Sequence, residues 1–74
     1  MNLREHALAG QARWRLAEDE RISGLPIDVH VQDGDVHVLG MVESDKQRKT
    51  IELLLNGICG VQQIVMDRLL IRER

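Results

Sequence analysis

Residues 27–42 read IDVHVQDGDVHVLGMV, in which two runs of alternating apolar and polar residues are separated by Asp33 and Gly34. Asp-Gly between two such runs is the strongest short-range signal for a β-hairpin, because a two-residue turn requires backbone conformations that these residues tolerate. A two-residue loop pairs Gln32 with Asp35 and thereby fixes the register of both strands. In that register all the valines fall on one face, which we expect to be buried.

The opposite face of this hairpin mixes polar and apolar residues. His30 lies opposite His37 in the same register, and the second strand continues through Leu39, Gly40 and Met41. Opposed side chains have Cβ atoms about 5 Å apart, close enough to share a metal ion, but two ligands are too few for a zinc site. We therefore expect a solvent-exposed or interfacial histidine pair. If an interface between proteins buried the histidine pair, protonation at about pH 6 would make the assembly sensitive to pH.

Helices are predicted before and after the hairpin. Asn2 is a typical N-cap residue, and residues 3–20 then contain no proline, which predicts the first helix. Ser44 and Gln47 have the spacing of a capping box that begins the second helix, and Gly57 and Gly60 mark its end.

A third strand is predicted over residues 61–71, which are rich in β-branched residues. Ile64 and Met66 are even-numbered, whereas Leu69 and Ile71 are odd-numbered, so the alternation slips between them. A β-bulge produces such a slip, because it adds one residue to one strand of a pair. The alternative is a short core-facing segment followed by a freer tail. The predicted order of elements is α-β-β-α-β.

One aliphatic core is predicted between the sheet and the helices. Its expected members share apolar character and the inward phase of their helix or strand. They are Leu8, Ala12, Leu16, Val29, Val31, Val36, Val38, Ile51, Leu55 and Ile58.

Trp14 is the only Trp, Tyr or Phe in the chain, and it falls on the side of the first helix opposite the predicted core stripe. Arg13 and Arg15 flank it, and Arg4 lies nearby. A tryptophan beside arginines suits an anionic membrane interface, where the indole sits at headgroup depth and guanidinium groups meet phosphates. The alternative is that Trp14 packs across the edge of the fold.

Other chemistry receives little support from the sequence. A net charge of -2 provides no overall field for polyanions, which disfavours a nucleic-acid-binding function. The GxxG at residues 57–60 matches the loop of KH domains, but it joins a helix to a strand and contains no lysine. Cys59 has no histidine within local reach to activate it, and a single cysteine forms no internal disulfide. We expect a buried or half-buried structural cysteine, no catalysis, no metal and no cofactor.

Residues 27–61, IDVHVQDGDVHVLGMVESDKQRKTIELLLNGICGV, resemble the BON domain family, named for bacterial osmotically induced and nodulation-related proteins. The matching features are the I-x-V-x-V strand, the Asp-Gly turn, the V-x-V-x-G-x-V strand, Ser44 before the helix and Gly60-Val61 before the last strand. The resemblance implies a single α+β domain over residues 1–74, with a three-stranded sheet covered on one face by two helices.

The resemblance also implies a non-enzymatic binding module that contacts phospholipid surfaces or envelope-associated protein partners. The arginine and tryptophan side of the first helix is the candidate surface. The alternative is a self-assembly module, a homo-oligomer that uses this side or the outer sheet face with its two histidines, Leu39 and Met41. Family members are usually exported to the bacterial envelope, whereas this sequence shows no signal peptide, so we expect the chain as given in the cytoplasm.

Overall fold

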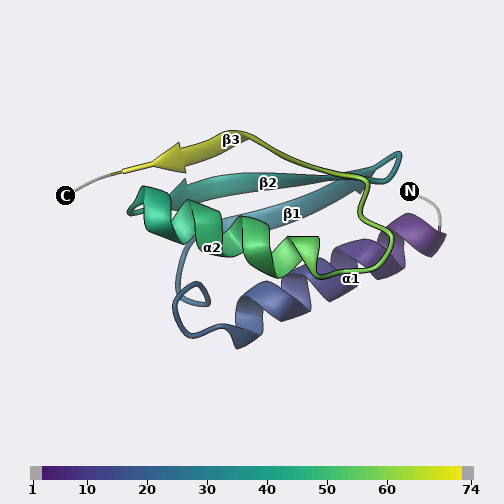
Figure 1. Cartoon of the computed structure of the whole chain (residues 1–74), viewed down its shortest axis with the longest axis horizontal. Coiled ribbons are helices and arrows are strands. Elements are labelled where there is room, and N and C mark those ends of the chain that lie inside the picture. Colours follow the sequence, from purple (N-terminus) through teal and green to yellow (C-terminus); the bar gives the residue numbers. More distant parts are fainter. Residues whose placement is uncertain (1–2, 73–74) are drawn as a thin grey trace.

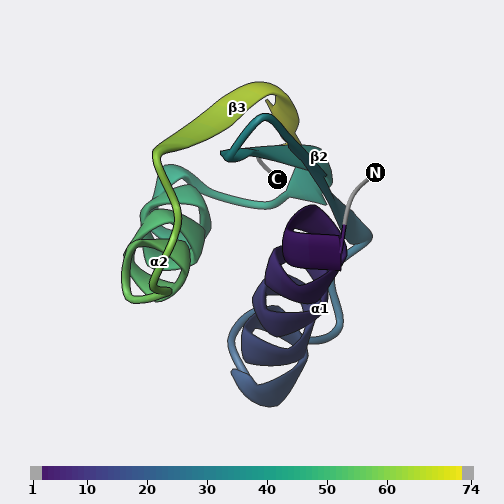
Figure 2. The same ribbon diagram turned by 90° about the vertical axis from the view of Figure 1, so that its right-hand side faces the viewer.

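The computed structural model describes residues 3–72 and places two helices on one face of a three-stranded sheet (Figure 1). The elements are α1 (Leu3–Glu18), β1 (Ile27–Gln32), β2 (Asp35–Val42), α2 (Asp45–Asn56) and β3 (Gln63–Ile71). The predicted α+β class and α-β-β-α-β order are confirmed. β2 is the central strand, antiparallel to β1 and parallel to β3. Figure 2 shows α1 and α2 on the same side of the sheet, so no helix of the described chain covers the other face.

The β1–β2 hairpin has the predicted register, beginning with Gln32 opposite Asp35. Asp33 has a φ of 54° and Gly34 a φ of 84°. Positive φ at both central residues is what a type I′ turn requires, and the twist of this turn matches that of the strands. The Asp-Gly signal therefore correctly predicted both the turn and the side of the sheet on which each residue of the hairpin lies.

Gly40 is the position in β2 where a side chain cannot be accommodated. It lies opposite Ile27 and has a φ of 122°. A Cβ atom there would lie 2.0 Å from the carbonyl oxygen of Pro26, and the same oxygen accepts a hydrogen bond of 3.1 Å from the Met41 N–H. The close passage of the chain at this point requires glycine.

The predicted bulge is present in β3. The pairing with β2 shifts between Val65 and Arg68, so that Met66 and Asp67 oppose a single residue. An extra residue reverses the side on which the following side chains point. Leu69 is consequently buried against the helices, although its odd number would place it on the outer face of a regular strand.

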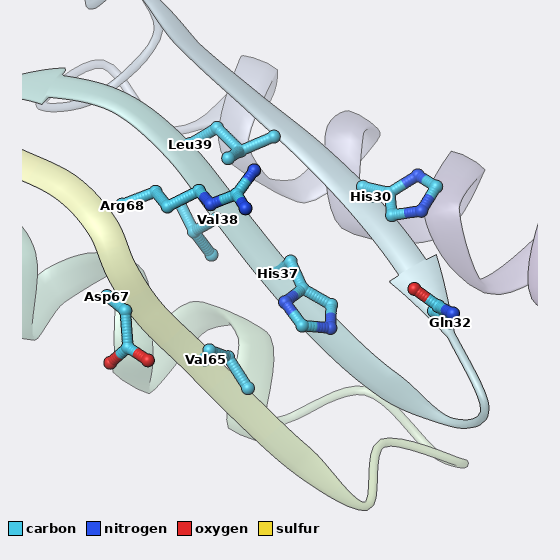
Figure 3. Close-up of a pocket in the computed structure, with 8 residues that line it drawn as sticks. All are labelled: His30, Gln32, His37, Val38, Leu39, Val65, Asp67 and Arg68. Carbon is cyan, nitrogen blue, oxygen red and sulfur yellow. The ribbon is translucent and has the colours of Figure 1, made fainter.

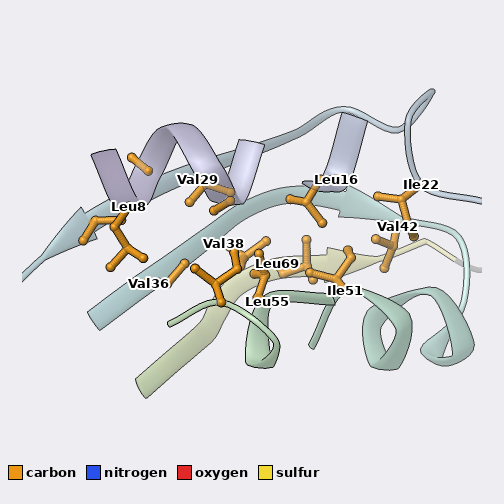
Figure 4. Packing of buried hydrophobic residues seen from close by; sticks show 14 residues of the cluster. Leu8, Leu16, Ile22, Val29, Val36, Val38, Val42, Ile51, Leu55 and Leu69 are labelled. Atoms are coloured by element: carbon orange, nitrogen blue, oxygen red, sulfur yellow. The ribbon is translucent and has the colours of Figure 1, made fainter. Parts of the chain in front are cut away.

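The core lies between the covered face of the sheet and the two helices, and every residue predicted for it is buried (Figure 4). The structure adds Ala9, Ile22, Val42 and Leu69 to that set. The full buried cluster is Leu8, Ala9, Ala12, Leu16, Ile22, Val29, Val31, Val36, Val38, Val42, Ile51, Leu55, Ile58 and Leu69.

α1 ends at Glu18, before the predicted end at residue 20. The Asp19 carboxylate accepts hydrogen bonds from the Arg21 backbone N–H at 2.9 Å and from its guanidinium at 2.7 Å. The Asp19 carbonyl accepts from the N–H groups of Ile22 and Ser23. These contacts close a turn in place of another helical turn, and the bonds from Arg21 hold the pKa of Asp19 below its ordinary value.

The hairpin turn is anchored from two other parts of the chain. The Glu5 carboxylate accepts a hydrogen bond from the Asp33 backbone N–H. The Gln62 N–H donates to the Gly34 carbonyl at 3.1 Å, and β3 begins at the next residue, Gln63, two residues after the predicted start at 61.

The start of α2 is capped as predicted, because the Gln47 N–H donates to Ser44 Oγ at 3.2 Å. The N-cap predicted at Asn2 lies outside the described residues.

Candidate functional site

Trp14 stands on the side of α1 that faces away from the sheet. Its side is the reverse of the one on which Leu8, Ala12 and Leu16 are buried, and 62% of Trp14 is exposed. It lines a shallow hollow with Leu54 of α2. Since its ring is in contact with solvent instead of the core, Trp14 is available to a binding partner.

Arg13 is directed toward β1 instead of toward the surface around Trp14. Its guanidinium donates to the Val29 carbonyl at 2.7 Å and lies 3.4 Å from Asp28 Oδ1. The first bond satisfies a backbone acceptor on the outer edge of β1. Arg13 therefore joins α1 to the sheet.

The other two arginines lie at opposite ends of α1. The Arg15 guanidinium lies beside Gly57, just after the C-terminal end of α2, where the helix dipole favours a cation. Arg4 is exposed and lines a separate hollow that includes Cys59. Of the four residues predicted for one surface, the structure brings Trp14 and Arg15 together and separates Arg4 and Arg13 from them.

α2 adds residues to this side of the molecule that sequence reasoning missed. Leu53 is 75% exposed, directly opposite the buried Ile51 and Leu55. Lys46 and Lys49 are exposed and fall within about 40° of Leu53 on a helix that turns 100° per residue. Their helical spacing was the signal that would have found them. We call Trp14, Arg15, Lys46, Lys49 and Leu53 the helix face.

Asp45 moderates the positive charge at the start of α2. Its carboxylate contacts Arg48 at 2.5 Å and Lys49 at 3.3 Å, and these two cations hold the pKa of Asp45 below its ordinary value. The Lys49 side chain remains 71% exposed. Such surface ion pairs are weak, so Lys49 can exchange this partner for another anion.

The second candidate surface is the uncovered face of the sheet. His30 and His37 face each other there with ring centroids 6.3 Å apart and planes tilted by 48° (Figure 3). Leu39 and Met41 are half-buried, and Leu70 is 60% exposed. The predicted outer-face residues are therefore together on one surface, which we call the sheet face.

The bulge adds Arg68 to the sheet face. Arg68 pairs with Leu39, which in turn pairs with Asp28 on β1. Figure 3 shows the Arg68 side chain extending from β3 toward Leu39. Sequence reasoning did not assign Arg68 to this face, because its side depends on where within β3 the extra residue lies.

Among residues 3–72, no group of three or more His, Cys, Asp or Glu side chains is placed to hold a metal ion. Asp67 is turned away from the two histidines (Figure 3). Cys59 was predicted to be buried or half-buried, and this prediction was wrong because Cys59 is exposed. Ile58 takes the neighbouring core position, at 5% exposure, which turns Cys59 outward.

The sequence model of the BON domain family matches residues 5–73. The chain belongs to the BON domain family. This match confirms the resemblance inferred from the hairpin and the second helix. BON domains are binding modules associated with phospholipids and membranes, and the family is not a catalytic one. A search of curated proteins gave no match.

No helix within the described part of the BON domain is long and apolar enough to cross a membrane. The helix face and the sheet face of this BON domain each carry exposed apolar residues beside charged ones.

Proposed function

We propose that this BON domain is a non-enzymatic module that contacts anionic phospholipid surfaces through its helix face. The observation that carries the proposal is the position of Trp14, which is 62% exposed on the side of α1 away from the core. Indole rings favour the headgroup region of a bilayer. Full burial of a large apolar side chain is worth about 1.5–3 kcal/mol, so Trp14 and Leu53 supply a modest apolar contribution.

Basic side chains on the helix face supply the remaining attraction. Arg15, Lys46 and Lys49 are exposed, and each basic residue near an anionic membrane contributes about 1 kcal/mol. Because the whole chain has a net charge of -2, the attraction depends on which side approaches the membrane. Binding by this surface is expected to be salt-sensitive, since counterions screen it.

Co-sedimentation with vesicles tests this proposal. We expect the domain to sediment with phosphatidylglycerol vesicles and to remain in solution with phosphatidylcholine vesicles. Lys46→Glu should weaken binding by roughly tenfold or more, since a reversed charge changes the attraction by about 2 kcal/mol. Lys46 lies in the first turn of α2, where a carboxylate is favourable, so the fold should be retained.

Trp14→Ala should also weaken sedimentation. Leu70→Ala is the matched control, because Leu70 is 60% exposed on the sheet face. Equal binding to both kinds of vesicle, or a larger loss from Leu70→Ala than from Trp14→Ala, would contradict the proposal.

A further inference from the structure

The sheet face has an apolar centre with opposite charges on its two edges. Leu39 lies on the central strand, Asp28 on β1 and Arg68 on β3, all in one transverse row. Half-buried Met41 and exposed Leu70 form the neighbouring apolar pair. No helix of the described chain covers these residues.

We propose that the sheet face binds the same face of a second copy of this chain, forming a symmetric two-sheet sandwich. A two-fold axis that runs along β2 above Leu39 turns one sheet over onto the other. This rotation keeps the transverse row at the same position along the strands and places β1 of one copy over β3 of the other. Asp28 of each copy then lies over Arg68 of the other, and Leu39 lies over its own counterpart.

The geometry of packed sheets is compatible with these contacts. Sheets in a sandwich lie about 10 Å apart with strands rotated by about 30°. The edge strands lie about 5 Å to either side of β2. A rotation of about 30° around the line through the two Leu39 residues, perpendicular to the sheets, therefore moves the edge residues by only about 2.5 Å. An arginine side chain spans that offset and reaches a carboxylate across the interface.

Both charged residues are available for such a pair. Arg68 is exposed, and within residues 3–72 it makes no ion pair. Asp28 contacts Arg13 at 3.4 Å, yet 71% of the Asp28 side chain is exposed. Charge complementarity between a surface and its own two-fold copy favours a second copy over an unrelated partner.

The bulge in β3 sets the side on which Arg68 lies. If β3 kept all its residues and alternated regularly from Ile64 onward, Arg68 would point toward the core. The two-for-one pairing at Met66 and Asp67 places Arg68 on the outer face in the row of Asp28. Bulges commonly re-aim a side chain in this way.

The size of the surface predicts a weak dimer. Three strands about 4.8 Å apart and six to nine residues long give a footprint on the order of 350 Å² per copy. Stable interfaces bury about 800 Å² per partner. Association should therefore depend on concentration and be visible below about 1 mM.

Sedimentation velocity over a concentration series up to about 1 mM tests the proposal. We expect the mass to rise toward twice the 8.5 kDa of one chain. Arg68→Glu should weaken association at least tenfold, because it places two carboxylates opposite each other at both edges. Arg68→Glu combined with Asp28→Lys should restore it. The melting temperature of each variant shows whether it is folded.

Lys46→Glu is the matched control, since it makes the same change in charge on the helix face. It should leave association unchanged. A monomer throughout the series, a dimer insensitive to Arg68→Glu, failure of the charge exchange to restore association, or equal loss in Lys46→Glu would each overturn the proposal. In the sandwich the two helix faces point in opposite directions, so vesicle binding is tested separately from association.

Discussion

The two faces of one three-stranded sheet differ in what their side chains do. On the covered face, Val29, Val36 and Val38 are at most 1% exposed and belong to the hydrophobic core. On the sheet face, the intervening residues of the same strands include His30 and Leu39, and no described helix covers them. The backbone ladder is common to both faces, so their difference lies in the side chains. Alternation along the strand determines the stability of one face and the binding properties of the other.

The largest loss of stability is expected at Gly40, which lies on the covered face between the buried residues Val38 and Val42. Gly40→Ala should cost about 3 kcal/mol or more, because its Cβ would clash with the Pro26 carbonyl at a positive φ. Thermal unfolding measures this loss. Gly10→Ala is the control, since nothing lies within 4 Å of a Cβ at Gly10 and alanine favours the helix by up to about 1 kcal/mol. Similar melting temperatures for the two variants would contradict the close contact.

A matched pair of leucines compares the two faces directly. Leu55 is fully buried beneath the sheet, so Leu55→Ala should lower the free energy of unfolding by about 2–5 kcal/mol. Leu39→Ala on the sheet face should cost less than about 1 kcal/mol at concentrations where the chain is monomeric. Urea unfolding gives both values. Equal losses in the free energy of unfolding would contradict the difference in burial between Leu55 and Leu39.

Deletion of Asp67 tests the link between the bulge and the two faces. The shortened strand would alternate regularly, with Met66 inward, Arg68 outward and Leu69 inward. We expect the deletion to fold and to change stability by no more than about 1 kcal/mol, since it removes an unpaired residue and no core contact. Thermal unfolding and backbone amide chemical shifts report the outcome. A chain that fails to fold would contradict the assigned position of the bulge.

The smallest effect is expected at the exposed start of α2. Arg48 and Lys49 lower the pKa of Asp45 in the folded chain, so Asp45 contributes stability at neutral pH. That contribution is lost as the pH falls through the acidic range, between about pH 5 and pH 2. Asp45→Asn should therefore be slightly less stable at pH 7 and equal to the wild type at the acidic end. An identical pH dependence of unfolding in both proteins would contradict this assignment.

The sequence predicted the covered face well because two independent patterns agreed there. The Asp33-Gly34 turn and the valine alternation specified the same register, and the capping residue Ser44 specified where α2 starts. The side of Arg68 was not predictable, because alternation shows that a slip occurs but does not place it. The role of Arg13 depends on a contact with β1 across the edge of the sheet, which has no local signal in the sequence.

Only part of the helix face was predicted from the sequence. Trp14 was found because its phase on α1 opposes the core stripe. Lys46, Lys49 and Leu53 have the corresponding phase on α2 and could have been found in the same way. That both helices lie on one side of the sheet is a property of the tertiary structure, and it is what relates these residues to Trp14.

Intrinsic fluorescence of Trp14 tests the membrane proposal most directly, because the chain has no other tryptophan and no tyrosine. Trp14 begins 62% exposed, so insertion at headgroup depth should shift its emission to the blue. We predict this shift with phosphatidylglycerol vesicles, its reversal at high salt and no shift with phosphatidylcholine vesicles. An emission spectrum unchanged by saturating phosphatidylglycerol vesicles would contradict a membrane contact through the helix face.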